Sequence, residues 1–315
     1  MTLNIVYFCL GIFLLYFGSE WMVKGASSLA LSLSIRPAIV GLTVVAFATS
    51  APEFLVSLFA AIRGSSGVSL GNILGSNVAN IGLVLGLSAL VKPITVDKKL
   101  VRREIPFMVG VSGLFWLVCI DGRIGRTDGI ILLAILAVFL ILGIATAKRS
   151  SAENQKTAVI REKKRVFHVF LILIGMGGLI FGAHLMINSA IFIARRLGIS
   201  EIFIGLSIVA LGTSLPEMAT SVVAVVRGEH DISMGNVVGS NVFNICMVIG
   251  FVGVFSPMPV DMKLMRFEFP VMFLLSVMLF IFSRINFTIN RLEGFFFMVS
   301  YFFFIGLSYL LDIAH

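Results

Sequence analysis

Long apolar runs separated by short polar loops make up almost the whole chain of 315 residues. A membrane-spanning helix needs about 20 mostly apolar residues. The pattern predicts ten spanning segments, at residues 3–32, 37–62, 68–91, 105–120, 129–147, 167–194, 202–226, 232–255, 269–282 and 294–311. The longest polar stretch, AKRSSAENQKTAVIREKKRV, lies between the fifth and sixth segments and is too short for a folded domain. The sequence therefore predicts an all-α membrane protein with ten transmembrane helices.

One polar stretch inside this apolar pattern occurs twice. Residues 41–81 read GLTVVAFATSAPEFLVSLFAAIRGSSGVSLGNILGSNVANI, and residues 205–245 match them without a gap at a constant offset of 164 residues. The matching extends on both sides, so residues 1–147 and 167–315 each hold five predicted segments, and 148–166 form a linker. Two consecutive units with an odd number of spans must cross the membrane in opposite orientations. This is the inverted-repeat architecture of secondary transporters.

The basic residues indicate the orientation. Most of the 24 Lys and Arg fall on one side of the membrane if the N-terminus lies outside, and basic loops stay in the cytoplasm. Three basic residues of one loop are replaced by uncharged residues in the second copy: Lys92, Lys98 and Arg103 become Ser256, Met262 and Phe267. We therefore expect N-out and C-out topology with a cytoplasmic linker, in the plasma (inner) membrane. The net charge of +8 reflects these loops and does not indicate nucleic-acid binding.

Each copy of the repeated stretch places a carboxylate directly after a proline in the middle of an apolar segment: Pro52–Glu53 and Pro216–Glu217. Proline has no N–H, so it interrupts the helix and frees carbonyl oxygens. Irregular backbone at membrane depth is tolerated where it lines a cavity. A simple packing kink is the alternative, and the matched glutamates favour a site.

A second motif, GNxxGSN, supplies hydroxyl and amide groups at helical spacing: Ser76 with Asn80, and Ser240 with Asn244. Close helix packing is the alternative for its glycines, and interhelical hydrogen bonding for its asparagines. If the halves are inverted onto each other, the four segments meet at the membrane midplane. The resulting ligands are all oxygen atoms, which suit Ca²⁺. They include none of the thiolate and imidazole groups that Zn²⁺ prefers. Two carboxylates match the charge of one Ca²⁺ or two Na⁺.

These motifs resemble those of the cation/calcium exchanger superfamily, and most closely those of its bacterial sodium/calcium exchanger-type antiporters. The family signature pairs G-T-S-x-P-E with G-N-x-x-G-S-N in both halves; the first copy has Ala48 where the signature has glycine. The resemblance implies a secondary antiporter that exchanges Na⁺ for Ca²⁺ by alternating access, with no enzymatic activity and no cofactor. It implies gating by a sliding of the first and sixth segments.

The resemblance also implies the ion ligands by position. Carboxylate, hydroxyl and carbonyl groups would bind the cations at Glu53, Glu217, Thr49, Thr213, Ala46, Ala210, Ser50, Ser214, Ser76 and Ser240, with Asn80 and Asn244 beside them. Some members carry aspartate at the position of Asn244, where its charge could hold an additional cation. Asparagine has no charge, so we expect transport that needs no K⁺. We expect Ca²⁺ and Na⁺ as substrates, the lipid bilayer as the surrounding phase and a monomer. An H⁺/Ca²⁺ antiporter is the alternative, followed by a passive cation channel.

Overall fold

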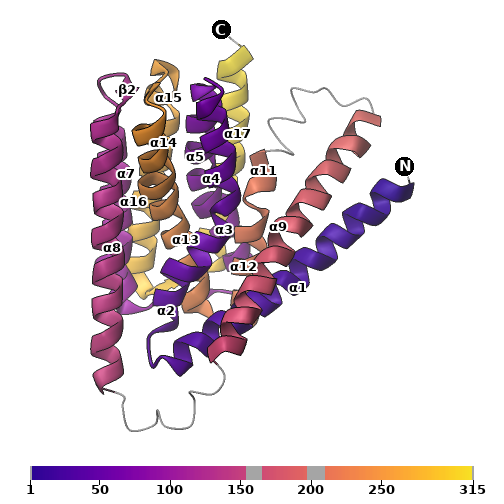
Figure 1. Cartoon of the computed structure of the whole chain (residues 1–315), viewed down its shortest axis with the longest axis vertical. Coiled ribbons are helices and arrows are strands. Elements are labelled where there is room, and N and C mark those ends of the chain that lie inside the picture. The colour runs from indigo at the N-terminus through magenta and orange to yellow at the C-terminus, as the bar shows by residue number, and fades with distance from the viewer. Residues whose placement is uncertain (1, 154–164, 197–209, 314–315) are drawn as a thin grey trace.

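Helices dominate the computed structural model, which describes residues 2–153, 165–196 and 210–313 (Figure 1). The helices of the first half are α1 (Thr2–Ser32), α2 (Pro37–Val40), α3 (Ala46–Thr49), α4 (Ala51–Ile62), α5 (Ser66–Ala79), α6 (Gly86–Val91), α7 (Ile105–Val118) and α8 (Arg126–Glu153). Those of the second half are α9 (Arg165–Arg196), α11 (Ala210–Thr213), α12 (Leu215–Val226), α13 (His230–Phe243), α14 (Gly250–Phe255), α15 (Met262–Arg266), α16 (Glu268–Asn286) and α17 (Arg291–Ile313).

Most helix boundaries lie within a few residues of the predicted segments, and the main difference is at the linker. Helix α8 extends to Glu153, beyond the predicted end at 147, and α9 begins at Arg165. Both ends of the predicted linker 148–166 are therefore helical. The first part of the predicted segment 202–226 lies outside the described residues.

Seven of the described helices are long and apolar enough to cross a membrane, and an eighth span results if the bent pair Pro37–Thr49 and Ala51–Ile62 counts as one. Two of these spans form the centre of the molecule, since 78% of the best window in Ser66–Val91 and 89% of that in His230–Phe255 is buried. The outer spans are exposed over most of their surface, as expected for helices that contact lipid.

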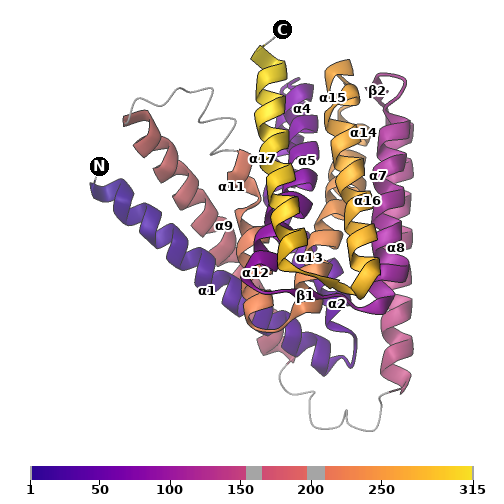
Figure 2. The same cartoon turned by 180° about the vertical axis from the view of Figure 1, so that it is seen from behind.

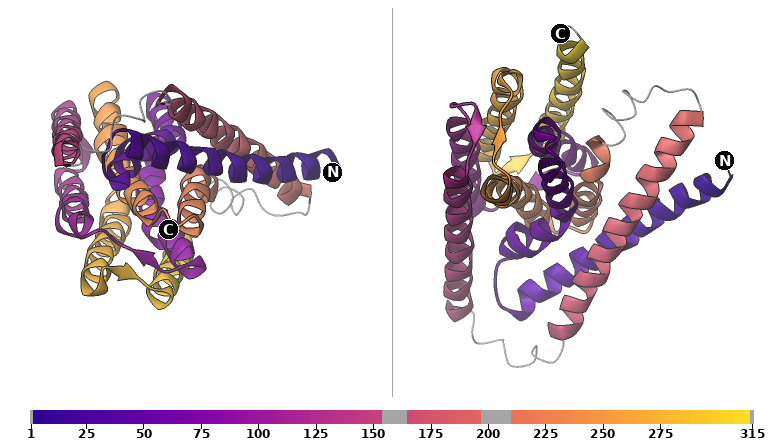
Figure 3. Two further views of the ribbon diagram at one scale, coloured as in Figure 1. Left: turned by 90° about the horizontal axis from the view of Figure 1, so that it is seen from below. Right: turned by 45° about the horizontal axis from the view of Figure 1, so that its top comes forward.

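Helices α1 and α9 lie side by side and cross the remaining bundle at an incline (Figures 1 and 3). Glycines bring their backbones together: a Cβ atom on Gly18 would lie 2.9 Å from the carbonyl oxygen of Gly175, and one on Gly11 would lie 2.8 Å from that of Gly182. Small residues at such positions permit close helix contact in membranes. The two long helices therefore form one tightly packed pair.

Two short antiparallel ladders join the halves of the chain. Strand β1 (Ile94–Thr95) pairs with β4 (Thr288–Ile289), and β2 (Arg123–Ile124) pairs with β3 (Met258–Pro259). The β1–β4 ladder lies at one end of the bundle and the β2–β3 ladder at the other (Figure 2). Each ladder takes one strand from each half, so the halves are tied together at both ends.

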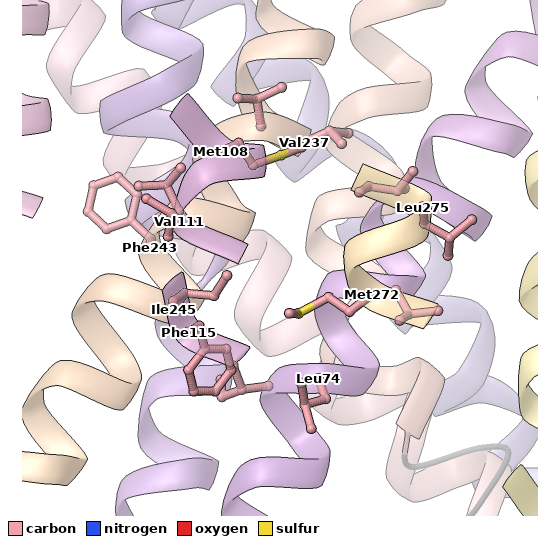
Figure 4. Packing of buried hydrophobic residues seen from close by; sticks show 14 of the residues in the cluster. Leu74, Met108, Val111, Phe115, Val237, Phe243, Ile245, Met272 and Leu275 are labelled. Carbon is pink, nitrogen blue, oxygen red and sulfur yellow. The ribbon is translucent and has the colours of Figure 1, made fainter. Parts of the chain in front are cut away.

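A buried core fills the space between α5, α7, α13 and α16 (Figure 4). Its side chains include Leu74, Phe115, Ile245 and Leu275. At the crossing of α7 and α16, the hydroxyl oxygens of Ser112 and Ser276 lie 3.4 Å apart, and these residues occupy equivalent positions in the two halves. The core therefore holds α5 and α13, the helices that carry the second motif, in fixed register.

Candidate cation site

The two proline-containing segments are broken just before the glutamates. Ser50 (φ −79°, ψ 2°) separates α3 from α4, and Ser214 (φ −88°, ψ 4°) separates α11 from α12. The axis bends by 45° at the first break. Pro52 and Pro216 lie in the first turn of the following helix, where a missing N–H costs least. The break therefore leaves Ser50 and Ser214 at the hinge, and each proline cannot donate to the carbonyl four residues earlier.

Glu53 and Glu217 lie in the first turns of α4 and α12. Their exposed fractions are 1% and 0%, and none of their four carboxylate oxygens has a hydrogen-bond partner among the residues that the structure describes. The Asn236 side chain accepts from the Thr49 hydroxyl and donates to the Glu217 carbonyl, so the broken segments that carry the two glutamates meet. Buried carboxylates normally have a cationic or hydrogen-bonding partner. This pair therefore has the acceptor capacity to bind a cation.

The hydroxyl groups beside the breaks differ between the halves. Thr49 Oγ1 lies 3.1 Å from Asn236 Oδ1, to which it donates, and 3.4 Å from Ser240 Oγ. Thr213 Oγ1 and the hydroxyls of Ser50 and Ser214 are buried without a hydrogen-bond partner in the described part of the chain. The contact between Thr49 and Ser240 joins the first half to the second within the site.

The alanine positions contribute backbone only. Ala46 begins α3, and its carbonyl accepts a hydrogen bond from the Ser50 amide (3.0 Å) and is a second possible acceptor for the Thr49 hydroxyl (3.3 Å). Ala210 begins α11. In this structure the Ala46 carbonyl is therefore part of the local hydrogen-bonding of the broken helix.

The other four predicted ligands are hydroxyl and amide side chains that are at most 3% exposed. Ser76 and Asn80 lie on the α5 side, and Ser240 and Asn244 lie on the α13 side. Asn80 and Asn244 each begin a π-helical turn, η2 (Asn80–Leu85) and η7 (Asn244–Ile249). Two other π-helical turns are η1 (Gly41–Val45) and η3 (Leu100–Glu104). Single π-turns often occur at functional sites. The side-chain oxygens of Asn80 and Asn244 are buried and have no partner among the described residues.

A second pair of asparagines holds the glutamate-bearing helices in place. Asn72 Nδ2 donates to Ser57 Oγ (2.9 Å) and to the Glu53 carbonyl (3.3 Å). In the second half, Asn236 Nδ2 donates in the same way to Ser221 Oγ (3.0 Å) and to the Glu217 carbonyl (3.4 Å). We assigned these residues no role from the sequence, although their recurrence in both copies was a signal for one.

The arrangement is suited to hard cations. Within residues 2–153, 165–196 and 210–313, no group of three or more His, Cys, Asp or Glu side chains is arranged to hold a metal ion. The site instead combines two carboxylates with neutral hydroxyl and amide oxygens. Ca²⁺ accepts six to eight such oxygens in flexible geometry, and neutral oxygens also bind Na⁺. Two carboxylates balance the charge of one Ca²⁺ or of two Na⁺, so the ions would compete for the same groups.

Comparisons with known proteins agree with this chemistry. The sequence profile of the family described as sodium/calcium exchanger protein matches residues 3–145 and again 167–310. The sodium/calcium exchanger MaX1 of Methanosarcina acetivorans is 30% identical over 96% of this chain and 97% of its own. The inner membrane protein YrbG of Escherichia coli is 35% identical over 88% of this chain and 87% of its own.

The fold has a counterpart among solved structures. A structure of the sodium-calcium exchanger NCX_Mj, soaked with 2.5 mM Na⁺ and 0.1 mM Ca²⁺, superposes with a TM-score of 0.85 at 34% sequence identity. The match covers 96% of this chain and 98% of that one.

Proposed function

The chain belongs to the sodium/calcium exchanger family, and from this premise we propose that it exchanges Na⁺ for Ca²⁺ at one site built around Glu53 and Glu217. It is a multi-pass membrane protein and a transporter, not an enzyme. The observation that carries the proposal is the pair of fully buried carboxylates whose oxygens lack partners among the described residues. A dication or two monovalent cations would neutralise them, and alternating access to the one site would couple the two fluxes.

We propose ligands for these ions from both halves. Glu53 and Glu217 would supply the negative charge, together with the hydroxyls of Thr49 and Thr213. The remaining oxygens would come from Ala46, Ala210, Ser50, Ser214, Ser76, Ser240, Asn80 and Asn244. The hydroxyls of Ser50, Ser214 and Thr213, which have no hydrogen-bond partner among the described residues, support this assignment. The Ala46 carbonyl and the Thr49 hydroxyl would exchange their present hydrogen bonds for the cation.

We propose that the fold consists of two inverted five-helix repeats, 1–147 and 167–315, with ten spans in all. Reciprocal contacts support the repeat, because a two-fold relation makes residue i contact j and the equivalent of i contact the equivalent of j. Strand β1 corresponds to β3 by sequence, yet these two strands lie at opposite ends of the bundle (Figure 2). The short helices α7 and α12 would complete the ten spans.

We propose that both termini lie outside a plasma (inner) membrane and that the linker lies in the cytoplasm. In a variant without the three native cysteines, Lys263→Cys is expected to react with a membrane-impermeant thiol reagent in intact cells. Ser151→Cys is expected to react only after the cytoplasmic face is opened. The reverse labelling would contradict the proposed orientation.

The driving ion is tested in proteoliposomes. An outward Na⁺ gradient without a pH gradient is expected to drive Ca²⁺ uptake, and a pH gradient without Na⁺ is expected to drive none. The alternative, H⁺/Ca²⁺ exchange, is favoured by the same two buried carboxylates, because buried carboxylates also bind protons. Uptake driven by the pH gradient alone would establish that alternative. Ca²⁺ leakage that needs neither gradient would instead indicate a channel.

A further inference from the structure

Two methionines end a pair of side-chain hydrogen-bond chains that lead to the candidate site. The Asn241 amide donates to Met108 Sδ (3.6 Å), and the Asn80 amide donates to Asn241 Oδ1 (3.0 Å). In the second chain, the Asn77 amide donates to Met272 Sδ (3.6 Å), and the Asn244 amide donates to Asn77 Oδ1 (3.3 Å). All six side chains are at most 1% exposed.

Each of these hydrogen-bond chains joins the two halves of the protein, and each residue of one has its equivalent in the other at an offset of 164. Met108 on α7 contacts Asn241 on α13, whereas Met272 on α16 contacts Asn77 on α5. Figure 4 shows both thioethers inside the bundle, among apolar side chains such as Val237 and Leu275. The same polar contact at both equivalent positions is difficult to explain by filling space alone, because a leucine fills a similar volume.

The thioether gives each chain a direction. An amide has a donor end and an acceptor end, and a chain of two amides can run either way if its ends are unspecified. A methionine sulfur accepts a weak hydrogen bond but cannot donate one, so Asn241 must turn its NH₂ group toward Met108. Its Oδ1 then faces Asn80, which must turn its own NH₂ group toward Asn241. The Asn80 oxygen is left without a partner in the described part of the chain, and the same holds for Asn244.

We propose that Met108 and Met272 are positioning residues that keep the side-chain oxygens of Asn80 and Asn244 turned toward the cation. The inference rests on the proposed function, since it concerns the affinity of that same site. With the opposite direction, an NH₂ group would face the cation and repel it. The energy between an ion and a dipole scales with the ionic charge, so misdirected amides weaken Ca²⁺ binding more than Na⁺ binding. The thioethers therefore favour Ca²⁺ over Na⁺.

The test compares Met108→Leu, Met272→Leu and the double variant with wild type and with Met234→Leu. Met234 is a buried methionine on α13 for which no hydrogen bond is seen to the described residues, so its replacement reports on packing alone. Binding of Ca²⁺ and of Na⁺ is measured by calorimetry on the purified protein, and thermal unfolding is measured without ions. Groups that orient metal ligands typically change affinity by 10–100-fold, and because a thioether bond is weak we expect about a tenfold loss of Ca²⁺ affinity per variant.

The expected result is a larger loss for Ca²⁺ than for Na⁺, at an unfolding temperature no lower than that of Met234→Leu. Unchanged Ca²⁺ and Na⁺ affinities would overturn the inference. So would equal losses for both ions accompanied by lower stability, since that pattern indicates packing. The proposed function is judged separately by Na⁺-driven flux: wild-type protein that binds Ca²⁺ without such flux would refute exchange, while the binding comparison would still decide the role of the methionines.

Discussion

Replacing either Glu53 or Glu217 by glutamine is expected to abolish Ca²⁺ transport while raising the stability of the ion-free protein at alkaline pH. Each substitution removes half of the negative charge at the site and leaves a bound dication under-neutralised among buried groups. An unpaired buried charge costs several kcal/mol. The same cost applies to the ion-free wild type only where its two buried carboxylates, which lack partners among the described residues, are ionised. A proton removes it, so the gain in stability is expected at alkaline pH.

Flux and unfolding measurements check both effects in the same preparations. Ca²⁺ should raise the unfolding temperature of the wild type, since a ligand that binds only the folded state stabilises it, and it should leave the glutamine variants unchanged. Glu293→Gln is the matched control, because the Glu293 carboxylate in the first turn of α17 accepts a hydrogen bond from the Asn290 amide and belongs to no part of the proposed site. Wild-type Ca²⁺ flux in either Glu53→Gln or Glu217→Gln would refute the proposed site.

Gly239→Ala is expected to lower Ca²⁺ transport by about tenfold or more, through misplaced ligands. A Cβ atom at this position would lie 2.6 Å from the carbonyl oxygen of Leu42 and 2.7 Å from the Cβ of Ala46. Both neighbours are backbone or Cβ atoms and cannot rotate away. Helix α13 must therefore move from the segment that carries Thr49, and Ser240, 3.4 Å from the Thr49 hydroxyl, moves with it.

Gly110→Ala is the control for this substitution. Gly110 lies on α7, where an added Cβ would meet no atom within 4 Å. Ca²⁺ flux is measured for both variants together with their unfolding temperatures, since overpacking also costs about 1–3 kcal/mol of stability. Equal flux in Gly239→Ala and wild type would contradict the close approach of α13 to α3.

Features that depend on local chemistry could be predicted from the sequence. Proline cannot donate a backbone hydrogen bond, so a break near Pro52 and Pro216 follows from the residue type alone; the structure places the breaks two residues earlier, at Ser50 and Ser214. The long apolar runs located most of the helices. They failed at the end of α8, because hydropathy marks where a chain leaves the membrane, while a helix continues through polar residues to Glu153.

Contacts between the halves could not be predicted in this way. Nothing near Met108 in the sequence distinguishes it from a core methionine, and its partner Asn241 is 133 residues away. The recurrence of Asn77 and Asn241 indicated that both positions matter, but their hydrogen bonds depend on how two distant helices cross. Thr49 has a hydrogen-bond partner and Thr213 has none among the described residues. Both copies have threonine at this position, so this difference is also a property of the fold.

The contact between Ser112 and Ser276 bears on how such a chain arose. If the halves are the inverted repeats proposed above, this contact lies on the two-fold axis, where a residue meets its own copy, and in an ancestral homodimer of five-helix units this serine would have met itself. Such a unit must insert in both orientations, and its sequence cannot favour either one. Fusion into one polypeptide removes that constraint, and each copy can then acquire its own loop charges. The loss of Lys92, Lys98 and Arg103 at Ser256, Met262 and Phe267 is the divergence that gene duplication and fusion would permit.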